Sequence, residues 1–165
     1  MSNKSASAGD RQFEQLPTAL TGHLGYLLVV LGKRAQRAFS EALEPEGLRP
    51  AHFDIMAAVE AGRCSQATLS RNLALEPAHL VALLDELEAK QLVRRAADPD
   101  DRRRYVIELT TRGVTTFKRL ARLSADVEND LMVSLSARDR SELGRLLTAL
   151  ARAGEHPSHE QPKKR

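Results

Sequence analysis

The spacing of apolar side chains along the chain predicts a series of helices. A first apolar stripe recurs at intervals of three and four residues from Leu20 to Phe39, between Pro17, which suits a first helical turn, and the breakers Pro45 and Gly47. Three shorter helices are then expected to start at Pro50, Ser65 and Pro77. The third of these carries leucine on a single face, at Leu80, Leu83, Leu84 and Leu87.

The pattern changes after the fourth helix, where a β-hairpin is expected. Leu92–Arg95 is a strand candidate, Asp98–Asp101 forms a turn cluster, and Tyr105–Leu109 alternates with a period of two. The tip of this hairpin carries consecutive arginines, Arg102, Arg103 and Arg104. A long helix capped by Thr110 is expected to follow, and then a last helix whose start, Ser136–Asp139, resembles a capping box.

This order of elements predicts a fold that is mainly α with a small β-hairpin wing. Two short helices joined by a tight turn and followed by a hairpin make a winged helix-turn-helix. The long helices at both ends carry more apolar surface than they can cover, so a second copy of the chain is expected to pack on them. The predicted parts are a disordered tail at 1–15, a dimerisation helix at 16–48, the winged helix-turn-helix lobe at 49–110, dimerisation helices at 111–153 and a disordered tail at 154–165.

Composition narrows the class of protein. The 165 residues are 42% hydrophobic and 28% charged, as in a globular domain, and the net charge of +3 mildly suggests a polyanionic partner. With aromatic residues at 4%, a large aromatic-lined substrate cleft is not expected. The motifs of phosphate-binding loops, serine hydrolases and zinc proteases are absent, and the histidines lack metal-binding spacing. We therefore expect no enzyme, cofactor or metal site; a small-molecule-binding enzyme is the more distant alternative.

Cysteine content and the lack of a long apolar segment indicate the cytoplasm. Cys64 has no partner for an intrachain disulfide, which fits a reducing compartment. Leu24–Leu31 is too short to cross a bilayer and Met1–Asp10 has no hydrophobic signal region, so no membrane partner is expected. Cys64 is expected to be a small buried hydrophobe; the alternative is a redox sensor whose thiol pKa is lowered by Arg63.

Two stretches between residues 73 and 113 resemble the MarR family of bacterial and archaeal regulators. They are LALEPAHLVALLDELEAKQLVRR and DPDDRRRYVIELTTRG, and the most specific part is Asp101-Arg102-Arg103 followed by Leu109-Thr110-Thr111-Arg112-Gly113. The resemblance implies a triangular homodimer with two DNA-binding lobes and a pseudo-palindromic operator in double-stranded DNA. It also implies a regulator, most often a repressor, whose DNA binding is weakened by a small-molecule effector or an oxidant.

In the family pattern the arginines of the hairpin contact DNA. Arg103 corresponds to the residue that enters the minor groove, and Asp101 corresponds to the carboxylate that orients its guanidinium. Arg102 and Arg104 are included as neighbouring contacts. The alternative is that this charged run is only a solvated turn.

The family's recognition helix corresponds to the helix that starts at Pro77, and its outer face is unusual. That face has no Arg, Lys, Asn, Gln, Ser or Thr, so His79 is its only evident hydrogen-bond donor, while Ala78, Val81 and Ala82 could contact thymine methyl groups. Contacts to the DNA backbone are expected from Ser65, Gln66, Arg71 and Asn72. The alternative is a winged-helix protein-interaction module whose DNA readout is weak or lost.

Two further expectations concern the backbone and a pocket. Glycines common in the family are replaced by Ala74 before the recognition helix and by Gln91 after it, so a strained or rearranged backbone is expected at both. The family's effector pocket is expected near His52, with Tyr26 and Met56 as wall residues. The alternative is that these side chains are ordinary core or interface.

Overall fold

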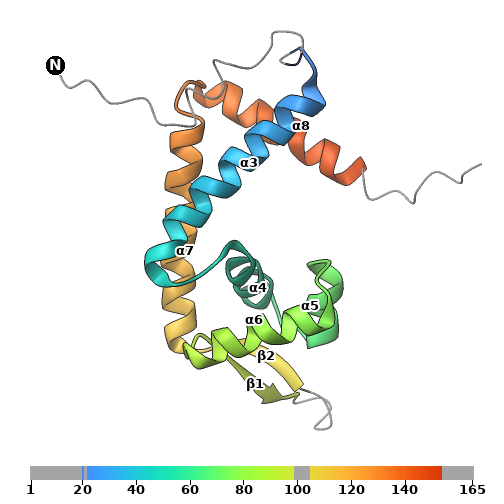
Figure 1. Cartoon of the computed structure of the whole chain (residues 1–165), viewed down its shortest axis with the longest axis vertical. Helices are drawn as coiled ribbons and strands as arrows, with labels where there is room; N and C mark the ends of the chain where they lie inside the picture. Colours follow the sequence, from blue (N-terminus) through green and yellow to red (C-terminus); the bar gives the residue numbers. More distant parts are fainter. Residues whose placement is uncertain (1–19, 21, 99–104, 154–165) are drawn as a thin grey trace, which may run out of the picture. The chain divides into compact units, whose positions relative to one another are not determined.

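The computed structural model describes residues 20, 22–98 and 105–153 (Figure 1). The chain divides into two compact units, Met1–Val127 and Glu128–Arg165. The described residues form helices and one antiparallel hairpin that follows a pair of short helices, which confirms the predicted winged helix-turn-helix fold class. The elements are α3 (Leu24–Leu43), the 3-10 turn η1 (Glu44–Glu46), α4 (Pro50–Glu60), α5 (Gln66–Asn72), α6 (Pro77–Ala89), β1 (Val93–Ala97), β2 (Tyr105–Leu109), α7 (Thr111–Leu131) and α8 (Ala137–Ala153).

The first long helix starts later than the apolar stripe predicts. Helix α3 begins at Leu24, whereas Pro17 lies outside the described residues. His23 adopts an extended conformation, with φ −100° and ψ 112°, and it follows Gly22. The break before α3 therefore falls at Gly22 and His23.

Polar caps and prolines set the starts of the other helices as predicted. Pro50 and Pro77 occupy the first helical positions of α4 and α6. The Ser65 hydroxyl accepts a hydrogen bond of 3.1 Å from the backbone N–H of Thr68 at the start of α5. At the start of α7 the Thr110 hydroxyl accepts from the backbone N–H of Gly113 at 2.9 Å. These caps satisfy N–H groups that have no partner inside their own helix.

Both positions where glycine is replaced are left-handed, as expected. Ala74 has φ 50° and Gln91 has φ 59°. Each closes a helix through a Schellman motif, because Leu75 N–H donates to the carbonyl of Ser70 at 3.0 Å and Leu92 N–H donates to that of Leu87 at 2.9 Å. A non-glycine residue in this conformation costs on the order of 1 kcal/mol, so the chain retains tight turns on both sides of α6 at a small cost in stability.

One hydrophobic core lies beneath α6. The four leucines predicted to share a face are all buried, with at most 1% of each exposed, and they pack with Ile55, Leu69, Ile107 and Leu120 among others. Three phenylalanines connect further helices to this core. The ring of Phe53 on α4 meets Phe39 of α3 edge-on at 5.2 Å and stacks on Phe117 of α7 at 5.5 Å.

The predicted hairpin is present, although its alternation of buried and exposed residues is only partly correct. Strands β1 and β2 pair from Val93 opposite Leu109 to Ala97 opposite Tyr105, and Cys64 adds an isolated bridge to Ile107. Tyr105 is 66% exposed, whereas Val106 and Ile107 are both buried. Ile107 belongs to the main core, and Val106 is buried outside that core cluster. The residues predicted for the tip, Asp101, Arg102, Arg103 and Arg104, lie outside the described residues.

The start of α7 is fixed against the end of α6. A Cβ added at Gly113 would lie 1.9 Å from the carbonyl oxygen of Leu92, so no larger residue fits there without a shift of the backbone. The same carbonyl accepts a hydrogen bond of 3.0 Å from Thr110 N–H. The joint between the short β1 strand and the long helix is therefore tightly packed.

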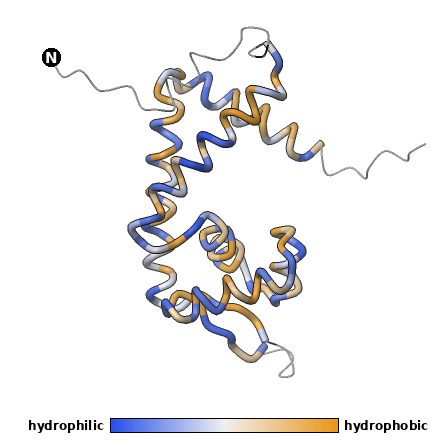
Figure 2. Tube along the Cα trace, viewed as in Figure 1, coloured by the Kyte–Doolittle hydropathy of each residue, from blue (hydrophilic) through white to orange (hydrophobic). Residues whose placement is uncertain are grey.

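The second unit contains the end of α7 and the whole of α8. The Ser136 hydroxyl accepts from the backbone N–H of Asp139 at 3.2 Å and donates to the Asp139 carboxylate at 2.6 Å, so the predicted capping box forms in a modified way. None of the described residues of α8 is buried. Figure 2 shows the apolar stretches of this helix, where Leu146 is 46% exposed, Leu147 37% and Leu150 61%.

Candidate nucleic-acid interface

The outer face of α6 is the surface on which the predicted base contacts lie. Ala78, His79, Val81 and Ala82 are all exposed there, with Val81 at 38%. The face opposite holds the buried leucines, so the helix is amphipathic and its orientation in the lobe is set by packing. The structure thus brings these four predicted residues together on one solvent-facing surface.

Helix α5 presents the predicted backbone-contacting residues less uniformly. Ser65 and Gln66 at its start are half-buried, and the Ser65 hydroxyl is engaged as a cap. Ser65 is the N-cap of α5, and the other three residues lie on that helix, which precedes α6 across the left-handed turn at Ala74. Arg71 and Asn72 at its end are exposed to solvent.

The carboxylates in the C-terminal half of α6 are held by arginine from β1. Arg95 Nη2 lies 2.7 Å from the Asp85 carboxylate, and Arg95 Nη1 contacts the Glu88 carboxylate. Glu88 also accepts a hydrogen bond of 3.0 Å from the backbone N–H of Arg95. One guanidinium thus contacts two acids on the helix, offsets one of their two charges and joins that helix to the hairpin.

A third acid of α6 is held by the start of α4. Arg49 Nη2 donates to both oxygens of Glu86, at 2.6 and 2.7 Å. His52 Nε2 lies 3.1 Å from the same carboxylate, although the ring N–H is not aimed at it well enough to form a hydrogen bond. The hydrogen bond from Arg49, together with the nearby positive charge, keeps the pKa of Glu86 below its usual value.

His52 is a structural residue of the α4 start. Its side chain is 1% exposed, and Nδ1 accepts a hydrogen bond of 3.1 Å from the backbone N–H of Arg49. Burial, and then the charge of Arg49, lowers the pKa of His52 below 6.5. The neutral ring, with its proton on Nε2, is the form that fits both contacts. Sequence reasoning missed this role, for which the available signal was a polar residue three positions after the N-cap.

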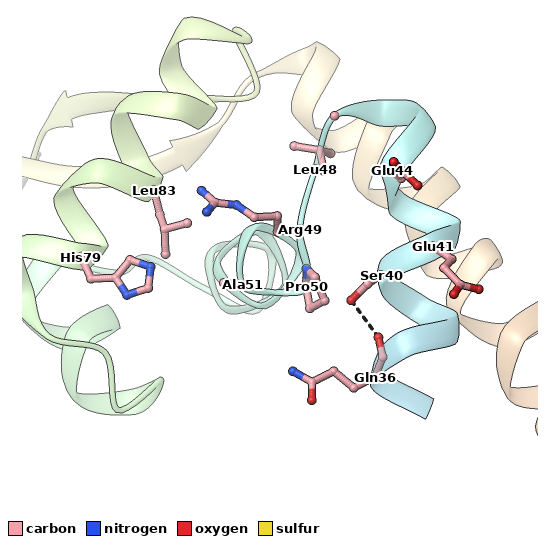
Figure 3. Close-up of a pocket in the computed structure, with 11 residues that line it drawn as sticks. Gln36, Ser40, Glu41, Glu44, Leu48, Arg49, Pro50, Ala51, His79 and Leu83 are labelled. Carbon is pink, nitrogen blue, oxygen red and sulfur yellow. Dashed lines mark hydrogen bonds between the residues drawn. The ribbon is translucent and has the colours of Figure 1, made fainter. Parts of the chain in front are cut away.

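A cavity of about 580 Å³ lies between α6, the start of α4 and the second half of α3. Figure 3 shows His79 and Leu83 on α6, with Gln36 and Ser40 across the cavity on α3. The Ser40 hydroxyl donates to the Gln36 carbonyl at 2.8 Å. The full lining is Gln36, Ser40, Glu41, Glu44, Gly47, Leu48, Arg49, Pro50, Ala51, His79 and Leu83.

The predicted effector residues do not line this cavity. His52 and Met56 are buried in the lobe, with 1% and 0% exposed, and Tyr26 is half-buried near the start of α3. His52 and Met56 are four residues apart on α4 and therefore share a face, but that face packs into the core. The cavity wall is formed instead by their neighbours Arg49, Pro50 and Ala51.

Cys64 packs as a small buried side chain. It is 7% exposed, and its Sγ lies 3.4 Å from the carbonyl oxygen of Ala58, to which the thiol donates. Burial raises the pKa of the Cys64 thiol, which is the opposite of the direction expected if Arg63 stabilised a thiolate. The structure therefore favours the hydrophobic interpretation of this residue.

Comparisons with known proteins identify the same class of protein as the winged helix-turn-helix fold does. The sequence model of the MarR family matches residues 46–104. The chain is similar to the transcriptional repressor NicR of Pseudomonas putida, with 25% identity over 93% of this chain and 98% of that protein. It also resembles the structure of the transcriptional repressor CouR bound to a 23-mer DNA duplex, with 30% identity, a TM-score of 0.73 and coverage of 83% of this chain and 99% of that one.

A further structure in this group is a mutant of MarR from Escherichia coli in complex with operator DNA. It is 26% identical with a TM-score of 0.66, and the match covers 77% of this chain and 92% of that one. Within residues 20, 22–98 and 105–153, no helix combines the length and apolar character that a membrane crossing requires. Fold, hairpin, sequence match and these relatives agree: the chain belongs to the MarR family of transcriptional regulators.

Proposed function

We propose that the protein is a ligand-responsive transcriptional repressor that binds a pseudo-palindromic operator in double-stranded DNA as a homodimer. The observation that carries this proposal is the outer face of α6, where Ala78, His79, Val81 and Ala82 are exposed on a helix held by a buried leucine face. A helix of this kind fits the major groove of DNA. The repressors NicR and CouR and the DNA complexes of CouR and MarR support it.

Charge compensation makes α6 suitable for a polyanion. A free carboxylate that lies 4 Å from a phosphate is repelled by about 1 kcal/mol even in water. The one charge of Arg95 is shared between Asp85 and Glu88, and Arg49 offsets the charge of Glu86, so two of the three acidic charges are compensated. The helix can therefore approach DNA although it carries acids and no lysine or arginine before Lys90.

The remaining DNA contacts of the proposal come from the residues predicted on either side of α6. The hairpin tip would supply Arg103, oriented by Asp101, with Arg102 and Arg104 beside it. The α5 helix would supply contacts to the phosphate backbone from Ser65, Gln66, Arg71 and Asn72. Because phosphate contacts release counterions, the affinity should fall steeply with salt.

Exposed apolar surface on both end helices supports the homodimer. On α3, Leu24 is 79% exposed, Leu28 48%, Val29 54% and Leu31 50%. On α8, three leucines are exposed by 37% or more. Apolar patches of this kind mark interfaces, and a second copy of the chain is the simplest partner. In this proposal 16–48 and 111–153 form the dimerisation region, and 49–110 is the DNA-binding lobe.

The cavity beside α6 is the proposed effector site. Its volume of about 580 Å³ lies in the range of small-molecule sites. His79 lines this cavity and is also exposed on the DNA-facing helix. A ligand that contacts the imidazole would therefore compete with its contact to a base and weaken operator binding. Tyr26, His52 and Met56 remain predicted effector residues. The alternative is that His52 and Met56 are ordinary core residues and that Tyr26 is an ordinary residue of α3.

The second candidate is a winged-helix protein-interaction module. The alanine-rich face of α6 favours it, because few of its side chains can read base edges. Neither proposal includes catalysis, because the relatives are transcriptional regulators. The proposed location of the protein is the cytoplasm.

Fluorescence anisotropy distinguishes the two candidates. The full chain is titrated into labelled duplexes at low salt: a random duplex, and fragments recovered by sequencing the DNA that the protein binds in its own cell. A repressor binds the random duplex weakly and the recovered fragments at least about a thousandfold more tightly. Absence of binding to both kinds of duplex would favour the interaction module instead.

A further inference from the structure

A second cavity lies at the end of α6 opposite to His79. It has a volume of about 540 Å³ and lies between η1, the C-terminal end of α6 and the first turns of α7, all within the unit Met1–Val127. Because a helix rises 1.5 Å per residue, Lys90 lies about 16 Å from His79 along the axis of α6. The lining is Glu46, Leu48, Lys90, Leu92, Thr111, Arg112, Thr115, Thr116 and Arg119.

We propose that this cavity binds a small free oxyanion, a molecule that carries phosphate or carboxylate groups. Three cationic side chains and one acid line it, so the wall has an excess of two positive charges. Arg119 Nη2 lies 2.6 Å from the Glu46 carboxylate, and these two charges offset each other. Lys90 and Arg112 form no ion pair with any residue in the described part of the chain. They are available to a ligand.

An unpaired threonine hydroxyl on the same wall offers a ligand a contact that does not depend on charge. Thr116 is 8% exposed, and its hydroxyl has no hydrogen-bond partner among the described residues. Its neighbour Thr115, by contrast, donates to the carbonyl of Thr111 at 3.1 Å. The described residues have one buried side-chain N or O atom without a partner, His52 Nε2, so the Thr116 oxygen is not sealed off and is accessible to an oxygen atom of a ligand.

The position at the start of a long helix adds to the attraction for an anion. Thr111, Arg112, Thr115 and Thr116 all belong to the first turns of α7, a helix of 21 residues. The N-terminus of a helix carries a partial positive charge, which favours a bound anion. Charge excess, the unpaired hydroxyl and the helix end therefore act on the same cavity.

The cavity fits a compact ligand better than an extended polymer. Leu48 and Leu92, which are 4% and 3% exposed, contribute apolar wall, and the polar groups come from three separate segments around it. A volume of about 540 Å³ suits a small molecule, and the excess of two charges matches a dianion. A bound oxyanion would link Lys90 of α6 to Arg112 of α7.

Titration calorimetry of the full chain with sodium pyrophosphate, at constant ionic strength and without DNA, tests the site. We expect saturable binding that Arg112→Gln weakens at least about tenfold, because a charged hydrogen bond is lost. Thr116→Val should weaken binding about threefold or more, and Thr116→Ser should restore it. Lys118→Gln removes the same charge from an exposed position of α7 outside the cavity and should leave binding unchanged.

Three results would overturn the proposal. The first is no saturable binding of pyrophosphate to the folded wild-type chain. The second is an equal loss of affinity in Lys118→Gln and Arg112→Gln, which would mean general charge attraction. In the third, Arg112→Gln and Thr116→Val weaken duplex DNA binding while pyrophosphate does not bind, so the cavity would hold a DNA phosphate. Because the titration contains no DNA, its failure leaves the proposed repressor function untouched.

Discussion

Helices α6 and α8 carry leucine at the same spacing but cover it to very different degrees. The leucines at 80, 83, 84 and 87 of α6 are at most 1% exposed, whereas those at 146, 147 and 150 of α8 are 46%, 37% and 61% exposed. The first helix is packed by its own chain, and the second leaves its stripe exposed. Periodicity thus identifies the apolar face of a helix, but it does not identify what covers that face.

The largest expected effect is the loss of a core leucine. Leu84→Ala should lower the free energy of unfolding by about 2–5 kcal/mol, because it removes buried methyl groups and leaves a cavity. Urea denaturation should show this loss equally at every protein concentration. Leu150→Ala is the matched change on α8, and its effect should grow on dilution, because it acts on association. If the loss of stability depended on protein concentration in the same way for both variants, the proposed difference between a core leucine on α6 and an interface leucine on α8 would be wrong.

The next effect concerns one arginine of the DNA-binding lobe and one of the dimerisation region. Arg103→Ala, at the position predicted for the hairpin tip, should weaken operator binding by at least about 1 kcal/mol, because the proposed groove contact would be lost. Arg37→Ala, at an exposed position of α3, should leave the affinity unchanged. Gel-shift titration on the operator measures both. Equal losses would show that net charge, and not the position of the charge on the lobe, determines affinity.

A smaller effect is expected where arginine shields the acids of α6. Arg95→Gln should weaken DNA binding by about 0.5–1 kcal/mol, because Asp85 and Glu88 would then face the phosphates without compensation. The double variant Arg95→Gln/Asp85→Asn should recover part of the loss, measured by anisotropy at low salt. Arg94→Gln, which breaks the pair with Glu108 at 2.8 Å, serves as the charge-matched comparison and should not be rescued by Asp85→Asn.

The smallest effect is a dependence of stability on pH. The folded-state pKa of His52 lies below its unfolded value of 6.5, so the neutral ring is favoured in the folded protein. Its contribution to stability is therefore present above pH 6.5 and is lost as the pH falls through the folded-state pKa. In urea denaturation His52→Asn should make the loss of stability between pH 7 and pH 5 shallower, while His23→Asn on the exposed start of α3 should not. If His52→Asn left the pH dependence of the free energy of unfolding unchanged, the lowered folded-state pKa of His52 would be contradicted.

The sequence predicted the lobe well because its determinants are local. Pro77 starts α6, the leucine spacing sets the buried face, and the missing glycines at 74 and 91 correctly indicated left-handed residues. The cap of Ser65 was likewise correct because donor and acceptor are three residues apart. Such features depend on neighbours along the chain, so a single sequence suffices to find them.

Contacts between distant residues were beyond the sequence. Arg49 and Glu86 are 37 positions apart, and Arg95 meets Asp85 only because the hairpin folds against α6. The cavity next to His79 combines α3, α4 and α6, so its wall differs from the residues predicted around His52. The burial of Val106 next to the buried Ile107, where the sequence predicted alternation, also results from long-range contacts. Whether the second face of a strand is buried depends on which distant segments fold over it.

The tight packing of Gly113 against Leu92 has a consequence for signal transmission. With the oxygen of Leu92 1.9 Å from where a Cβ would lie, this joint has no free space to absorb a displacement. A rotation of α6 that shifts Leu92 must also turn the first residues of α7. A substitution that relaxed this joint would uncouple the two helices while each stayed folded.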